Sequence, residues 1–160
     1  MAHAYSKLYH LPTTGLRYFT VYGPWGRPDM APFLFLDKIV HDGTIQVFNN
    51  GQMQRDFTYV DDVVEATVRV LNNPPSEEIP YRIYNVGHSS PLDLMDFIHL
   101  LEKCAGKTVK KEYKGMQQGD VLATYADTHL LENDIHFKPS TSIEEGVQAF
   151  YNWYMGFRKN

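Results

Sequence analysis

The side chains of this sequence that could do chemistry do not form a known catalytic or metal-binding pattern. The adjacent carboxylates Asp61 and Asp62 could act as an acid and a base, but such neighbours more often cap a helix and interact with its dipole. The seven histidines include no HExxH pair, and Cys104 is the only cysteine, so no metal site is expected. Gly87 precedes His88-Ser89-Ser90 without a GxSxG nucleophile elbow. We therefore expect no catalytic residue in this chain.

The motifs of a dinucleotide-dependent enzyme are also missing from the sequence. Gly23 and Gly26 begin a GxxGxxG spacing, but Asp29 occupies its third position, and no P-loop is present. No tyrosine is followed by lysine four residues later, so the sequence has no YxxxK motif. The most similar spacing is that of Tyr154 and Arg158, with arginine in place of lysine. From the residues alone, the chain has no self-contained catalytic apparatus.

The elements that must position these residues alternate between helix and strand. Helices are predicted over Ala2–His10, Pro32–His41, Asp62–Asn72, Pro91–Gly106 and from Ser142 onward, and strands over Thr14–Tyr22, Ile45–Phe48, Asp56–Val60, Arg82–Val86 and Val109–Tyr113. This alternation predicts an α/β fold with a mostly parallel sheet.

Several local signals sharpen these predictions. Thr14–Tyr22 lacks strict alternation, as expected of a strand buried on both faces. Capping boxes are predicted where Asp62 precedes Glu65 and where Ser142 precedes Glu145, and Pro91 is expected at the first position of its helix. The last helix carries one apolar stripe: Ile143, Val147, Phe150, Tyr154 and Phe157.

Composition limits the classes of partner. The 160 residues suit one domain, and a net charge of −4 without a basic stripe argues against nucleic acid. No signal peptide and no apolar run of membrane-spanning length occur, so a cytoplasmic location without membrane contact is expected. Eleven Tyr and nine Phe indicate either a core rich in rings or a pocket that stacks planar ligands. Cys104 lies in an apolar helical stretch and is expected to be a buried, inert thiol.

Four stretches, in order, resemble UDP-glucuronate 4-epimerases of the extended short-chain dehydrogenase/reductase type. They are LRYFTVYGPWGRPDMA from Leu16, QRDFTYVDDV from Gln54, YNVGHSSPLDLMDFI from Tyr84 and GDVLATYAD from Gly119. Members of that family move a hydride from the sugar C4 to NAD and return it to the other face, with the tyrosine of a YxxxK motif as base. The resemblance implies a UDP-sugar partner and a role in making capsule or envelope polysaccharide.

The resemblance also implies an organisation for the chain. It corresponds to the carboxy-terminal half of the family: the remnant of a Rossmann-type parallel sheet, residues 1–30 and about 55–90, plus the small substrate-binding domain, about 31–54 and 91–160. Met1 matches an internal methionine just beyond the YxxxK, so we expect the chain to be truncated inside a helix. NAD is then expected with the full-length parent and not with this chain alone. Family members pair through a helix bundle, so a homo-oligomer is expected.

Two residues are implied to recognise the acidic sugar. The strand threonine and the loop arginine of the family face the sugar C6 group, and these positions are Thr20 and Arg27 here. A guanidinium can bind the glucuronate carboxylate through two charge-assisted hydrogen bonds, and a hydroxyl adds a third donor. The alternatives are strand packing for Thr20 and an ordinary surface role in a Pro-rich loop for Arg27.

Three further residues are implied to hold the nucleotide. Arg55 corresponds to an arginine at the ribose and diphosphate, although it could instead pair with Asp56 or Asp61. Phe48 would lie beside uracil, but a hydrophobic edge-strand residue would look the same. Galactose epimerases carry an arginine where Met116-Gln117-Gln118 stands here, and Gln117 is expected to offer a neutral hydrogen bond in its place.

Four residues would border the nicotinamide in a full-length enzyme: Phe19, Val21, Tyr22 and Pro24. In this chain alone they could equally be strand and turn core. Three other interpretations remain open at this point: a non-catalytic UDP-sugar-binding or assembly module, another UDP-sugar epimerase or decarboxylase of the same family, and a fragment without a role of its own.

Overall fold

The computed structural model describes residues 1–157. The elements in chain order are α1 (Ala2–Tyr9), β1 (Thr13–Tyr18), β2 (Thr20–Tyr22), α2 (Ala31–Val40), β3 (Thr44–Val47), a 3₁₀ turn (Phe48–Gly51), β4 (Gln54–Arg55), β5 (Phe57–Tyr59), α3 (Val60–Leu71), β6 (Tyr81–Val86), β7 (Leu92–Asp93), α4 (Leu94–Ala105), β8 (Lys110–Tyr113), α5 (His129–Ile135) and α6 (Ile143–Phe157).

The strands of the described part pair two by two. The pairs β1–β6, β2–β5 and β3–β8 are parallel, and only β4–β7 is antiparallel. The predicted α/β class with mostly parallel pairing is confirmed.

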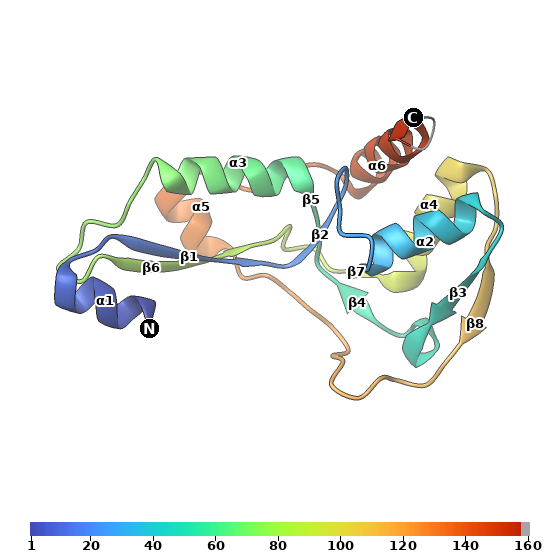
Figure 1. Cartoon of the computed structure of the whole chain (residues 1–160), viewed down its shortest axis with the longest axis horizontal. Coiled ribbons are helices and arrows are strands. Elements are labelled where there is room, and N and C mark those ends of the chain that lie inside the picture. Colours follow the sequence, from blue (N-terminus) through green and yellow to red (C-terminus); the bar gives the residue numbers. More distant parts are fainter. Residues whose placement is uncertain (158–160) are drawn as a thin grey trace.

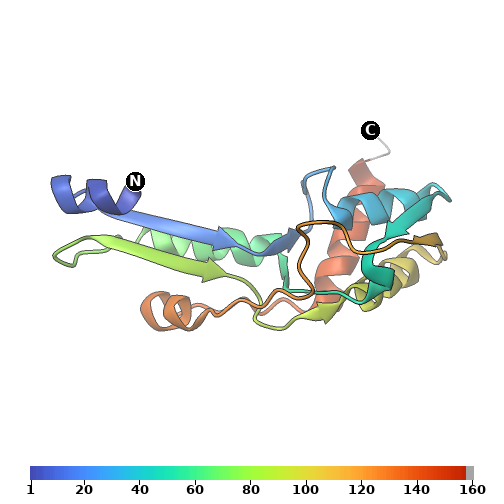
Figure 2. The ribbon, with the colours of Figure 1, turned by 90° about the horizontal axis from the view of Figure 1, so that it is seen from below.

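The described residues pack into two apolar cores at opposite ends of an elongated molecule (Figure 1). The larger core joins α2, α4 and α6 to β3 and β5, and its fully buried residues include Leu36, Phe97 and Tyr154. The smaller core joins α3 and α5 to β6, with Val63, Tyr84 and Leu131 inside it. Figure 2 shows β1 and β6 running side by side away from the larger core. A long segment after β8 returns from the larger core to α5 (Figure 1).

The capping box at Ser142 is confirmed. The Ser142 hydroxyl donates to Glu145 Oε2 at 2.6 Å, and the Glu145 N–H donates back to Ser142 Oγ at 3.3 Å. The predicted stripe on α6 is buried at Val147, Phe150 and Tyr154. α6 approaches β2 so closely that a Cβ at Gly146 would overlap the Tyr22 hydroxyl, so only glycine fits there.

Two other predicted helix starts are wrong. α3 begins at Val60, before Asp62, and the Asp62 carboxylate accepts the N–H groups of Ser140 at 3.2 Å and Thr141 at 2.9 Å. Pro91 does not open α4, because the next two residues pair with β4 as β7 and the helix begins at Leu94. In both places tertiary pairing outweighs the local capping signal.

The predicted strand Thr14–Tyr22 is broken at Phe19 and is not buried on both faces. The Phe19 N–H donates to Val86 O at 3.1 Å, after which β2 turns to pair with β5. Tyr18 is 48% exposed.

The thiol of Cys104 is only half-buried, although burial raises its pKa. α5 was not predicted. No helix in residues 1–157 has the length and apolar character needed to cross a membrane.

Candidate functional site

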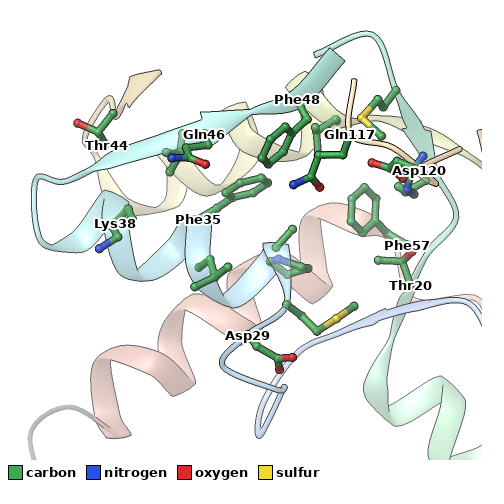
Figure 3. A pocket seen from close by; sticks show the side chains of 18 residues that line it. Thr20, Asp29, Phe35, Lys38, Thr44, Gln46, Phe48, Phe57, Gln117 and Asp120 are labelled. Carbon is green, nitrogen blue, oxygen red and sulfur yellow. Dashed lines mark hydrogen bonds and ion pairs between the residues drawn. The ribbon is translucent and has the colours of Figure 1, made fainter. Parts of the chain in front are cut away.

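A pocket of about 730 Å³ lies between α2, β3, β4 and the segment that follows β8 (Figure 3). Three phenylalanine rings contribute to its apolar lining: Phe35 from α2, Phe48 from the 3₁₀ turn after β3, and Phe57 from β5. The first residues of α2 form another part of its wall, through Met30, Ala31 and Pro32.

Four of the five residues predicted to bind substrate line this one pocket. They are Thr20, Phe48, Arg55 and Gln117, which come from four separate parts of the chain. Parallel pairing brings Thr20 opposite Phe57, and the Thr20 N–H donates to Asp56 O at 3.1 Å. The structure thus brings together four residues whose proximity the sequence could not predict. Their contact with a ligand stays a prediction.

The guanidinium of Arg55 is paired with a carboxylate that sequence reasoning missed. Its Nη2 donates to Asp120 Oδ1 at 2.6 Å, and its Nη1 donates to Gln54 O at 2.8 Å. The Arg55 side chain is 15% exposed, so the pair is largely shielded from water. Neither Asp56 nor Asp61, the alternative partners considered above, is the partner. The Gly119-Asp120 motif was the available signal for this residue.

The segment that carries Gln117 and Asp120 is fixed to β4 by its backbone. Gln54 N–H donates to Leu122 O at 2.9 Å, and Thr124 N–H donates back to Gln54 O at 3.2 Å. These bonds fix beside β4 the segment whose Gln117 and Asp120 line the pocket (Figure 3).

A buried carboxylate beside Arg55 holds the surrounding loops together. Asp56 is fully buried and accepts the backbone N–H groups of His88 at 2.8 Å, Ser89 at 3.0 Å and Ala126 at 2.9 Å. It therefore connects the strand that carries Arg55 to the loop after β6 and to the segment before α5. Sequence reasoning considered Asp56 only as a partner of Arg55.

Arg27 does not line the pocket, but its partner does. Arg27 donates through Nε to Asp29 Oδ1 at 3.1 Å and through Nη2 to Asp29 Oδ2 at 2.5 Å, and its side chain is 73% exposed. Asp29 lies on the pocket wall, and the hydrogen bond from Arg27 lowers the pKa of its carboxyl. The predicted sugar-binding arginine thus lies outside the pocket lining and is bound to a carboxylate of its own loop.

The same loop is attached to α6 through aromatic rings. Trp25 has a positive φ of 61°, which is unusual for a bulky residue. Its ring lies 5.5 Å from that of Trp153 and 5.6 Å from that of Phe157, measured between ring centroids. These contacts hold the loop between β2 and α2 against the end of α6.

The four residues predicted beside the nicotinamide do not line the pocket. Tyr22 is 3% exposed, its ring packs against Phe97, and chiefly burial raises the pKa of its hydroxyl. Phe19, Val21 and Pro24 are partly buried. The sequence has no GxxGxxG turn, the motif that binds a dinucleotide phosphate. No group of three or more His, Cys, Asp or Glu within residues 1–157 is placed to hold a metal ion.

Sequence comparisons relate the chain to nucleotide-sugar enzymes. The profile of the NAD dependent epimerase/dehydratase family matches residues 1–87. The chain is 51% identical to protein CapI of Staphylococcus aureus, over 99% of this chain and 52% of that protein. It is 47% identical to the probable UDP-glucuronate 4-epimerase of Rhizobium meliloti, over 96% of this chain and 50% of that protein.

Solved structures show the same relation. The UDP-glucuronic acid 4-epimerase of Bacillus cereus, in complex with UDP-glucuronic acid and NAD, superposes with a TM-score of 0.89 at 33% identity, over 98% of this chain and 49% of that chain. The chain spans about half the length of the relatives that it matches.

Proposed function

This chain belongs to the NAD-dependent epimerase/dehydratase family, and from that premise we propose that it is the UDP-sugar-binding half of a nucleotide-sugar 4-epimerase acting on UDP-glucuronate. One observation carries the proposal: Thr20, Phe48, Arg55 and Gln117 meet in a single pocket. We further infer that residues 1–30 and about 55–90 belong to the dinucleotide side, and about 31–54 and 91–160 to the substrate side. α5 then extends toward the dinucleotide side, because it packs on β6 and α3.

The pocket suggests how a nucleoside diphosphate would lie in it. The first N–H groups of a helix have no intrahelical acceptor and favour anions, and the start of α2 faces the pocket. With Arg55 also on the wall, this region suits the diphosphate. The rings of Phe35 and Phe48 offer flat apolar surface for the base. The sugar would then point toward Thr20 and the loop of Asp29.

Each residue of this chain has a binding role in the proposal. Arg55 donates hydrogen bonds to a phosphate, partly in place of its bond to Asp120. The Thr20 hydroxyl donates to the sugar. Arg27 turns from Asp29 to the glucuronate carboxylate. NAD supplies the hydride acceptor of the reaction in the family. A second function, UDP-sugar binding without hydride chemistry, is favoured by the fact that these binding residues stand in a sequence without a YxxxK motif.

Calorimetric titration of the 160-residue chain tests the binding role. We expect saturable binding of UDP and no binding of NAD. Arg55→Met should weaken UDP binding by at least about tenfold, because a charge-assisted hydrogen bond is lost. Arg17→Met is the matched control, since Arg17 is exposed on β1 and does not line the pocket.

Thermal unfolding of both variants checks that the fold is kept. The proposal is contradicted if the chain does not bind UDP, or if the two arginine variants lose affinity equally.

A further inference from the structure

The charged residues on the pocket wall differ in whether they already have a partner. Arg55 and Asp120 form an ion pair with each other, and Asp29 is paired with Arg27. The fourth charged residue of the wall is Lys38, and it has no ion-pair partner among residues 1–157. The nearby carboxylate of Asp42 is bound at 3.0 Å by Lys107. Lys38 is therefore the wall cation whose charge is not offset by a neighbouring carboxylate.

The position of Lys38 sets the part of a ligand that it can reach. It lies in the last turn of α2, and Figure 3 shows it with Thr44 and Gln46 at the end of the pocket away from Asp120. The Phe35 and Phe48 rings lie between these two ends (Figure 3). If the diphosphate lies at the start of α2 and beside Arg55, the far edge of the base points toward Lys38.

We propose that Lys38 selects the nucleobase: its ammonium donates to a ring carbonyl oxygen of a pyrimidine, so that the pocket prefers uracil to cytosine. This inference rests on the proposed function, because it assumes a nucleoside diphosphate in this pocket.

The chemistry of the two bases supports the selection. Uracil presents a carbonyl oxygen at the ring position where cytosine presents an amino group. A lysine ammonium has three donors and no acceptor, so it attracts the carbonyl and disfavours the amino group. Because Lys38 has no competing carboxylate partner, it need not give up an ion pair to bind the base. Thr44 and Gln46 add neutral polar groups at the same end of the pocket.

The test compares UDP, CDP and uridine as ligands of the full chain by calorimetric titration. Lys38→Met keeps the unbranched stem of the side chain, which packs over Gly43, and removes the ammonium group with its charge. Lys38→Arg keeps the charge. Lys103→Met is the matched control, because Lys103 is also exposed and also lies in the last turn of its helix, away from the pocket.

We expect Lys38→Met to weaken UDP and uridine binding by about five- to tenfold and to leave CDP binding nearly unchanged. Lys38→Arg should retain most of the preference for UDP, and Lys103→Met should behave like the unaltered chain.

Other results overturn the inference. Equal losses for UDP and CDP, with uridine unaffected, would place Lys38 at the phosphates. An unchanged ratio of UDP to CDP affinity in Lys38→Met would remove any role in base selection while leaving the proposed function intact. Failure of the unaltered chain to bind UDP would contradict the proposed function and this inference together.

Discussion

At the scale of single residues, three of the four charged side chains on the pocket wall, Asp29, Arg55 and Asp120, already have partners inside the protein. Arg55 is bound to Asp120, and Arg27 is bound to Asp29. A ligand must therefore compete for each guanidinium. For Arg27 the competition is mild, because both side chains of this pair are exposed and such pairs contribute little to stability.

The first residue-scale prediction concerns the acid group of the sugar. Arg27→Ala should weaken binding of UDP-glucuronate by about tenfold, or about 1.4 kcal/mol, and leave UDP-glucose binding nearly unchanged. Asp29→Asn should have the opposite effect and strengthen UDP-glucuronate binding, because the carboxylate that competes for Arg27 is removed. Competition titrations with the two sugar nucleotides measure both effects. Equal losses on both sugars in Arg27→Ala would show that Arg27 supports its loop instead.

The sequence could predict which residues of the site have suitable chemistry, but not their partners. Thr20, Phe48, Arg55 and Gln117 were named from motifs, and their meeting in one pocket depends on the parallel pairing of β2 with β5 and on the path of the segment after β8. The Gly119-Asp120 motif marks Asp120 in the sequence, but its pairing with Arg55 and the place of Lys38 on the wall could not be found from local sequence. Both depend on contacts between segments far apart in the chain.

At the scale of elements, the repeating apolar patterns predicted most helices and strands. The elements that were missed or misplaced depend on contacts with distant segments. α5 is only seven residues long, too short for a periodic pattern, and its existence depends on packing against β6 and α3. The two-residue strands β4 and β7 are too short for a periodic pattern and depend on pairing with distant segments, β4 with β7 and with the segment at Ala123. Asp62 looked like a cap but instead binds the backbone before α6.

The prediction at this scale concerns Asp56, which connects three segments. Asp56→Ala leaves the buried N–H group of Ala126 and the partly buried N–H groups of His88 and Ser89 without their carboxylate, so the free energy of unfolding should fall by about 3 kcal/mol. The matched control Asp61→Ala removes an exposed carboxylate from the first turn of α3 and should cost less than about 1 kcal/mol. Urea unfolding followed by circular dichroism measures both. If both variants lost a similar free energy of unfolding, the hydrogen bonds to Asp56 would add little to stability.

At the scale of the whole molecule, the two cores leave apolar surface exposed at the end that carries α1. Tyr5, Leu8 and Tyr9 of α1 are all more than half exposed. Within residues 1–157, β1 is paired along one edge only, with β6. An open strand edge beside exposed apolar side chains favours association with another chain.

We therefore expect the chain to form homo-oligomers through residues 2–22. Light scattering over a dilution series should show a mass that rises with concentration. Leu8→Glu should shift the chain toward monomer by placing a charge on the contact face. The control Leu122→Glu changes another exposed leucine, which lies outside residues 2–22, and should leave the association unchanged. A monodisperse monomer at high micromolar concentration would contradict this expectation.

The ring contact between Trp25 and Trp153 has a spectroscopic consequence. These are the two tryptophans of the whole sequence, and they lie in van der Waals reach of each other where the loop of Arg27 and Asp29 meets α6. Intrinsic fluorescence excited at the red edge of the indole band therefore originates from this junction alone. Movement of the loop when a sugar nucleotide binds would change the emission without any attached label. The protein thus carries its own optical probe beside the residues that are proposed to recognise the acid.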